Sequence, residues 1–247
     1  MEVNAEGCRP VPGQPAIGEK TFAAYGCSCV FGETVAIGDT FCAELQRKLP
    51  SWRVENHGVG NFGGIHSFLQ LSRALRWNRP DYVMFGWIPG HLARNVADLR
   101  WIQANSAKQA SRRTQHRWST PRAYLDQEGR LQYRMVAFHR TDLAEIDMRD
   151  YANDGYYMDQ ICFAIVERSA EIVRKAGGHF FLATLLGALS ARLAGLIANA
   201  GIPVIDASVS GRDFIAQDGH HPSPRAHQHY AETIHRYLTQ HAKSVPT

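Results

Sequence analysis

Two short segments of the chain contain residue types that could together perform nucleophilic catalysis. Ser28 lies in a Gly-Cys-Ser-Cys segment (residues 26–29), and Asp218 and His221 lie in an Asp-Gly-His-His-Pro segment (residues 218–222). A serine hydroxyl is a weak nucleophile until a base takes its proton. An aspartate three residues before a histidine allows one loop to present both groups, so that the carboxylate orients the imidazole. The spacing therefore predicts Ser28 as nucleophile, His221 as base and Asp218 as orienting acid.

Each segment also has an interpretation without catalysis. A serine after a strand commonly caps the segment that follows, and a polar loop such as residues 218–222 can cap a helix. His220 is an alternative base in the same loop. Cys27 and Cys29 could be redox or metal groups, but two ligands are too few for a zinc site, and we predict no metal site. We interpret the histidines that follow as surface residues: His227, His229 and His235.

Five short apolar segments alternate along the chain with segments whose apolar residues recur at helical spacing. The predicted strands are Thr21–Tyr25, Trp52–Asn56, Tyr82–Ile88, His179–Leu186 and Ile202–Ala207. The predicted helices are Thr40–Leu49 (with Asp39 as N-cap), Ile65–Trp77, Met158–Lys175, Ser190–Ala200 and Pro222–Gln240. This alternation indicates an α/β fold with a five-stranded parallel sheet covered by helices on both faces. Ligand sites in such sheets lie beyond the carboxyl ends of the strands, where both chemical segments fall.

The two segments, their order and their places after the first and the last strand resemble those of the SGNH hydrolases, also called GDSL-type esterases and lipases. The resemblance extends over the whole chain. It implies a flavodoxin-like, three-layer α/β/α sandwich, and it assigns the nucleophile to Ser28, the general base to His221 and the orienting acid to Asp218. The implied reaction is cleavage of an ester or thioester through an acyl-enzyme on Ser28, without any cofactor.

The chain departs from the SGNH pattern where the family has its oxyanion donors. Cys27 stands where the family has an aspartate before the nucleophile, a position outside the triad. After the second strand, the backbone donor of the family falls on Asn61, with Gly60 one residue earlier. After the third strand, the expected asparagine falls on Gly90, so the side-chain donor is missing there. Loss of one such donor typically slows an enzyme about 10²–10³-fold.

Another side chain must replace that donor if the chain is an efficient enzyme. Because Asn61 and His91 follow strand ends that converge on Ser28, we hypothesise that one of them takes the role. Arg94 and Asn95 are further candidates if their loop folds inward. The alternative is that His91 and Arg94 lie on the exposed face of a short helix.

Composition limits the remaining possibilities. The chain has 247 residues, a formal net charge of +4 and an ordinary apolar content, which fits one domain and excludes neither an anionic substrate nor an acidic partner. The charge does not indicate nucleic-acid binding. The longest apolar run, Phe180–Leu189, is roughly half the ~20 residues that span a bilayer, so we expect no membrane segment. Five irregularly spaced cysteines and the absence of a signal pattern favour a cytoplasmic location.

Two regions lie outside the predicted repeat of strands and helices. Residues 1–19 are expected to form an extended arm. Residues from about 100 to 155 are expected to form an insertion after the third strand, including a hairpin in which Arg122–Leu125 and Leu131–Ala137 flank a turn. Its basic part, residues 106–122, is a solvated loop or a lid for an anionic group. Trp118, Tyr124 and Tyr133 could then form an apolar wall.

Three functions remain open at this point. The first is hydrolysis of a small-molecule or carrier-bound acyl ester. The second is acyl or acetyl transfer, or thioester cleavage, in polysaccharide or natural-product biosynthesis. The third is a catalytically silent module that binds a sugar or an acyl group. The sequence does not specify the oligomeric state.

Overall fold

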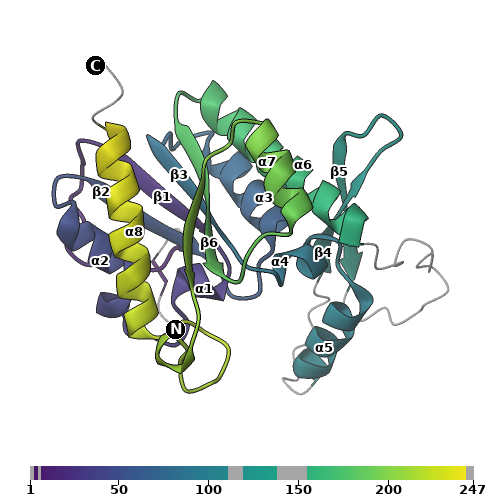
Figure 1. Ribbon diagram of the computed structural model, residues 1–247, viewed down its shortest axis with the longest axis horizontal. Coiled ribbons are helices and arrows are strands. Elements are labelled where there is room, and N and C mark those ends of the chain that lie inside the picture. Colours follow the sequence, from purple (N-terminus) through teal and green to yellow (C-terminus); the bar gives the residue numbers. More distant parts are fainter. Residues whose placement is uncertain (1–2, 5–6, 111–118, 138–154, 243–247) are drawn as a thin grey trace.

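The computed structural model describes residues 3–4, 7–110, 119–137 and 155–242, without the side chains of residues 106–110. Five strands form a parallel sheet in the order β2-β1-β3-β6-β7 (Figure 1). They are β1 (Thr21–Gly26), β2 (Arg53–Gly58), β3 (Tyr82–Trp87), β6 (His179–Leu186) and β7 (Val204–Val209). The predicted parallel sheet is confirmed. The strand order reverses direction between β1 and β3, and a ligand site is expected beyond the ends of these two strands.

Helices cover both faces of the sheet and make it a three-layer α/β/α sandwich (Figure 1). One face carries α1 (Ser28–Phe31), the 3-10 turn η1 (Ile37–Asp39), α2 (Phe41–Lys48) and α8 (Pro224–Ala242). The other face carries α3 (Gly64–Ala74), α6 (Gly155–Lys175) and α7 (Ala191–Asn199). A second 3-10 turn, η4 (Arg212–Phe214), lies between β7 and α8. The chain therefore places α1, which contains Ser28, on the α2/α8 face.

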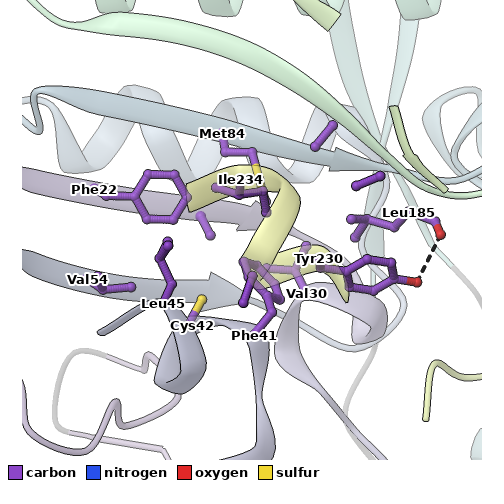
Figure 2. Packing of buried hydrophobic residues seen from close by; sticks show 14 of the residues in the cluster. Phe22, Val30, Phe41, Cys42, Leu45, Val54, Met84, Leu185, Tyr230 and Ile234 are labelled. Atoms are coloured by element: carbon purple, nitrogen blue, oxygen red, sulfur yellow. Dashed lines mark hydrogen bonds between the residues drawn. The ribbon is translucent and has the colours of Figure 1, made fainter. Parts of the chain in front are cut away.

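The core under α2 and α8 is apolar and densely filled. Phe22 of β1 and Ile234 of α8 are fully buried there, and Tyr230 donates its hydroxyl to the carbonyl of Leu185 at 2.9 Å (Figure 2). That hydrogen bond satisfies the one polar group of a large buried ring. It also fixes α8 against the end of β6, close to the loop that precedes α8.

Two predicted details at helix ends are wrong. The N-cap of α2 is Thr40 rather than Asp39, because the Thr40 hydroxyl accepts the N–H of Ala43 at 3.2 Å. His227 is buried rather than exposed, and its Nδ1 accepts the N–H of Phe41 at 3.1 Å. Burial, with the charge of Arg9, lowers the pKa of His227 to about 3, which keeps the ring neutral as an acceptor. His227 therefore joins the start of α2 to α8.

The segment between β3 and β6 contains α4 (His91–Asn95), α5 (Leu99–Ala110) and a two-stranded antiparallel hairpin of β4 (Ser119–Leu125) and β5 (Leu131–Ala137). The predicted hairpin is confirmed. It packs against α3, α4 and α6. Within it, Arg122 is buried, whereas Tyr124 and Tyr133 are exposed. Of the predicted basic part, residues 106–122, the residues Arg112, Arg113 and Arg117 and the Lys108 side chain lie outside the described residues, as does Trp118.

The arm before β1 packs against the edge of the sheet. The N–H of Arg9 donates to the carbonyl of Asn56 in β2 at 3.1 Å. The buried Arg9 guanidinium lies over the Phe31 ring and donates to the carbonyls of Phe31, Gly32 and Val35. These carbonyls lie at and just beyond the end of α1, so Arg9 fixes the chain that follows the candidate nucleophile. Among the described residues, no helix combines the length and apolar character that a bilayer-spanning segment requires.

Candidate active site

Ser28, His221 and Asp218 form a connected chain of side chains. The Ser28 hydroxyl lies 2.9 Å from Nε2 of His221, and Nδ1 of the same ring lies 2.5 Å from Oδ2 of Asp218. Ser28 is buried, whereas the other two residues are partly accessible to solvent. In this arrangement His221 can take the serine proton at Nε2 while its Nδ1–H donates to the carboxylate. These are the contacts that nucleophilic catalysis by a serine requires.

The turn that presents Ser28 depends on close packing of the backbone. Ser28 is the first residue of α1, immediately after β1. A Cβ atom on Gly26 would collide with the Val30 side chain, and one on Gly58 would collide with the backbone of Phe31. Glycine at these positions therefore allows β1, β2 and α1 to approach closely. The sharp turn that results presents the hydroxyl at the carboxyl end of β1.

Asn56 links β2 to the same turn. Its side-chain amide donates to the carbonyl of Val30 at 3.0 Å, and its side-chain oxygen accepts the N–H of Gly58 at 3.0 Å. The side chain is fully buried, so both hydrogen bonds form in a protected environment. Asn56 thus helps to fix α1 relative to β2.

Asp218 is held in the loop by its own backbone contacts. Its Oδ1 accepts the N–H groups of His220 and His221 at 2.9 and 3.0 Å, which leaves Oδ2 for the His221 ring. The hydrogen bond from the His221 side chain, followed by the backbone N–H groups, holds the pKa of Asp218 well below its usual range. The Asp218 carboxylate is therefore ionised in the folded protein at neutral pH. Because the His221 ring contacts both Asp218 and Ser28, His221 fits the role of base better than His220.

The turn after β2 lies beside this triad. The N–H of Phe62 donates to the carbonyl of Val59 at 3.2 Å, which makes Gly60 and Asn61 the central residues of a turn, and Asn61 has a left-handed φ of 69°. A Cβ atom on Gly60 would lie 3.5 Å from Glu33 Oε2, and that oxygen lies 3.6 Å from Nε2 of His221. Gly60 therefore lies close to the reacting groups. Glu33 also lies close to them, and no spacing or motif in the sequence indicates it.

Three of the candidate oxyanion residues have other contacts. The Asn61 carboxamide donates to the Asn105 side chain. The Asn95 side-chain oxygen accepts the N–H of Ile65 at 3.0 Å. His91 is buried rather than exposed on α4, and His91 and Asn95 line a narrow cavity between β3, α3 and α6. Among the described residues, His91 Nε2 and Asn95 Nδ2 have no hydrogen-bond partner.

The Arg94 side chain lies beside Gly90, the position at which the family has its asparagine. A Cβ atom on Gly90 would lie 3.5 Å from Nη2 of Arg94. Nη1 of the same guanidinium donates to the carbonyl of Phe62 at 3.0 Å, which directs the side chain toward the turn that contains Gly60. The pKa of the Cys27 thiol is lowered by its hydrogen bond with Cys29 and by the nearby His91 and Arg94. The guanidinium is thus close to the segment that contains the nucleophile.

The structure is similar to three solved structures over nearly the whole chain. A GDSL-like lipase from Bacteroides thetaiotaomicron has a TM-score of 0.53 at 13% identity, covering 92% of this chain and 91% of the other. A lipolytic protein of the G-D-S-L family from Veillonella parvula has a TM-score of 0.51 at 10% identity, covering 89% and 98%. An acetyl xylan esterase from Geobacillus stearothermophilus has a TM-score of 0.50 at 12% identity, covering 89% and 94%.

The chain has the fold of the SGNH (GDSL-type) hydrolases. At these identities the likeness concerns the fold alone, and the fold that the resemblance implied is confirmed. No family model matches the sequence, and no curated protein is similar to it. The chemistry of the site must therefore be argued from the residues that surround Ser28 in this chain.

The described residues contain no group of three or more metal-ligating side chains that could hold a metal ion. All five cysteines lie among the described residues; each is buried, and none of them forms a disulfide. Cys27 and Cys29 flank Ser28 from within the core. The side chains that can do chemistry at the end of β1 are therefore the serine, the histidine and the two carboxylates of Asp218 and Glu33.

Proposed function

We propose that this protein is a serine esterase that forms an acyl-enzyme on Ser28. The Ser28 oxygen attacks the acyl carbonyl while His221 takes its proton at Nε2. His221 then gives that proton to the leaving alcohol, and water repeats the cycle to release the acid. Asp218 keeps the ring in the required tautomer and stabilises its protonated form. The observation that supports the proposal most directly is the 2.9 Å contact between Ser28 and His221, with Asp218 on the far side of the ring.

The oxyanion is stabilised in this proposal by two backbone groups and one side chain. The N–H of Ser28 is at the start of α1 and has no partner within the helix. The N–H of Gly60 is in the turn beside Glu33 and His221. The placement of Arg94 beside Gly90 supports it, rather than Asn61 or His91, as the third donor. A guanidinium is a stronger donor to an anion than a neutral amide, because the hydrogen bond is charge-assisted.

The proposed substrate is a small-molecule or carrier-bound acyl ester, and the likeness to lipases and to an acetyl xylan esterase supports hydrolysis over transfer. The triad geometry argues against a silent binding module. A cytoplasmic location remains part of the proposal, and five cysteines that form no disulfide support it.

Steady-state hydrolysis of p-nitrophenyl acetate and p-nitrophenyl butyrate tests the proposal. The wild-type protein should hydrolyse both esters, and Ser28→Ala and His221→Ala should each reduce kcat by at least about 10³-fold. His220→Ala, in the same loop but without contact to the serine, is the matched control and should keep most of the activity. Equal activity in the wild type and Ser28→Ala would show that another group is the nucleophile.

A further inference from the structure

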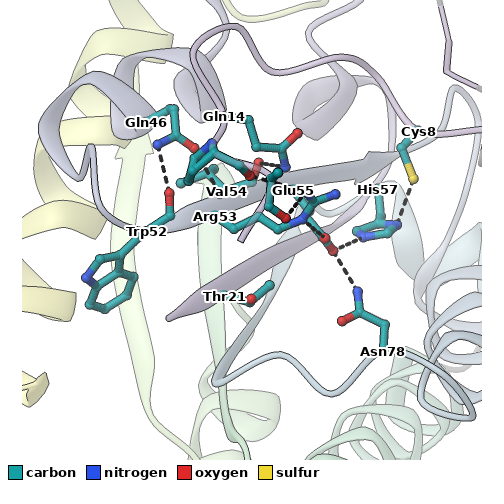
Figure 3. A network of polar contacts seen from close by, with 12 residues as sticks. Cys8, Gln14, Thr21, Gln46, Trp52, Arg53, Val54, Glu55, His57 and Asn78 are labelled. Atoms are coloured by element: carbon teal, nitrogen blue, oxygen red, sulfur yellow. Dashed lines mark hydrogen bonds and ion pairs between the residues drawn. The ribbon is translucent and has the colours of Figure 1, made fainter. Parts of the chain in front are cut away.

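A second group of reactive side chains lies away from Ser28, at the edge strand β2. The sulfur of Cys8 lies 3.0 Å from Nδ1 of His57, and Nε2 of His57 lies 2.9 Å from Oε2 of Glu55 (Figure 3). Glu55 and His57 are two residues apart on a strand, so their side chains share one face. Cys8 comes from the arm, which pairs with β2 next to it through Arg9 and Asn56. The order thiol, imidazole, carboxylate is that of an activated cysteine nucleophile.

Two further side chains, Arg53 and Asn78, stabilise the ionised form of Glu55. Arg53 Nε and Asn78 Nδ2 each donate to it at 2.8 Å. Although burial alone would raise it, the pKa of Glu55 is lowered to about 2 by hydrogen bonds from His57 and Arg53. Burial would likewise lower the pKa of His57, but the contacts with Cys8 and Glu55 raise it to about 9. At neutral pH the ring is therefore protonated and donates one N–H to the carboxylate and the other to the sulfur.

The group opens into a large pocket. Cys8, Glu55 and His57 line a cavity of about 920 Å³ at the junction of β2, α3 and the β4–β5 hairpin. The cavity is large enough for a drug-sized ligand. The rest of its wall is mixed: six residues are apolar (Phe62, Leu69, Ala74, Trp77, Pro121 and Met135) and five are polar (Arg53, His66, Gln70, Arg73 and Asn78).

Two further observations favour a ligand over a purely structural network. The side-chain oxygen of Gln70, in the wall of the cavity, is buried and has no hydrogen-bond partner among the described residues. Trp77, at the same cavity, exposes 69% of its surface, which is unusual for a tryptophan without a partner. An apolar ligand in the cavity would cover Trp77.

This pocket is separate from the Ser28 site. Glu55 and His57 pair in register with Ala23 and Tyr25 of β1, and these four side chains lie on the α3/α6 face of the sheet. The His57 ring stacks on Tyr25 with its centroid 4.5 Å away. Ser28 and α1 lie on the opposite, α2/α8 face. Cys8, His57 and Glu55 therefore lie on the other face of the sheet from α1, and Ser28 does not line this cavity.

We propose that Cys8, His57 and Glu55 form a second nucleophilic site, at which Cys8 accepts an apolar acyl group from an activated acyl ester. The Cys8 sulfur attacks the acyl carbonyl and forms a C–S bond, and the thiol proton is relayed through Nδ1 of His57, which lies 3.0 Å from the sulfur. The C–O bond to the leaving alcohol breaks, and the proton passes from His57 to that oxygen. The products are a thioester on Cys8 and a free alcohol, with no oxidant or metal required. This site does not depend on the function proposed for Ser28.

The test uses the Ser28→Ala protein, so that acylation of the serine cannot contribute. The protein is incubated with p-nitrophenyl butyrate and its intact mass is measured over time. We expect the mass of one butyryl group to appear, peptide mapping to place it on Cys8, and neutral hydroxylamine to remove it, as it does a thioester. Cys8→Ser in the same background should abolish the modification. His57→Gln should slow it by about 100-fold, the usual contribution of a positioned proton-transfer group.

His235→Gln, which changes a partly exposed histidine of α8, is the matched control and should leave the rate unchanged. If circular dichroism shows that His57→Gln does not fold, Glu55→Gln is the second variant, and it should also slow the reaction. Absence of any butyryl adduct, an adduct on a residue other than Cys8, or an unchanged rate in both base variants would overturn the proposal. Because Ser28 is absent throughout, these outcomes are independent of whether the wild-type protein hydrolyses esters.

Discussion

The carboxylate of Glu33 lies 3.6 Å from Nε2 of His221, the ring nitrogen that also contacts Ser28. The same carboxylate borders Gly60, whose N–H is a proposed oxyanion donor. A negative charge at this place repels any substrate that is itself negatively charged near the reacting carbonyl. Glu33 is therefore a candidate determinant of specificity for neutral acyl groups.

Glu33→Gln should relax that specificity. We expect kcat/KM for a succinyl ester to rise by about 3–10-fold relative to a neutral butyryl ester, since the glutamine keeps the shape and removes the charge. The difference should shrink as the salt concentration rises, because exposed charges are screened. The measurement is kcat/KM for both esters at low and high ionic strength. An equal change for the two esters would mean that Glu33 acts on His221 or on the turn rather than on substrate charge.

Arg94 should contribute to the transition state rather than to substrate binding. Arg94→Ala should reduce kcat by about 10²–10³-fold with little change in KM, as is typical for loss of an oxyanion donor. Asn61→Ala should reduce kcat much less, because the Asn61 side chain already donates its hydrogen bond to Asn105. The readout is the separate measurement of kcat and KM in the three proteins. A larger loss in Asn61→Ala than in Arg94→Ala would return the donor role to Asn61.

Gly58 should tolerate no side chain. A Cβ atom there would meet the backbone of Val30 and Phe31, so Gly58→Ala must displace α1 from β2. We expect a loss of about 3 kcal/mol in the free energy of unfolding, together with loss of activity. Gly195→Ala is the control: it lies inside α7 with nothing within 4 Å of the new methyl group, and it should stabilise the protein by about 0.5–1 kcal/mol. The measurement is the free energy of unfolding of both variants in urea. An unchanged free energy of unfolding in Gly58→Ala would contradict the close packing described above.

Glu55 should make the protein sensitive to acid. Its pKa is about 2 in the folded state and 4.5 in its unperturbed state, so the stability it contributes is present above pH 4.5 and is lost as the pH falls toward 2. Between pH 5.5 and pH 3, the wild type should therefore lose about 2 kcal/mol more than Glu55→Gln. The measurement is the free energy of unfolding in urea at both pH values. Parallel losses in the two proteins would show that the Glu55 network is not formed in solution.

The strands of the sheet and the contact between Asp218 and His221 could be predicted because their signals are local. Tyr82–Ile88 is apolar throughout, which is typical of a buried parallel strand, and β3 indeed spans Tyr82–Trp87. Asp218 and His221 are three residues apart in one loop, so their contact needs no knowledge of the rest of the chain. The pairing with Ser28 followed from the carboxyl ends of parallel strands meeting at one edge of the sheet.

The features that were missed depend on residues far apart in the sequence. His227 accepts a hydrogen bond from Phe41 across 186 positions, and no pattern around either residue indicates it. Glu33 lies 3.6 Å from Nε2 of His221 although 188 positions separate the two residues, and no motif around Glu33 indicates that contact. Glu55 and His57 share a strand face, which the alternation of β2 could have indicated, but the arrival of Cys8 from the arm required the folded structure.

The central claim is that Ser28 is a nucleophile activated by His221, and labelling with a fluorophosphonate probe tests it most directly. The wild-type protein should react, and peptide mapping should place the phosphonyl group on Ser28. Ser28→Ala and His221→Ala should both remain unlabelled, while His220→Ala should label like the wild type. Absence of labelling in the folded wild-type protein, or labelling that persists in Ser28→Ala, would contradict the claim.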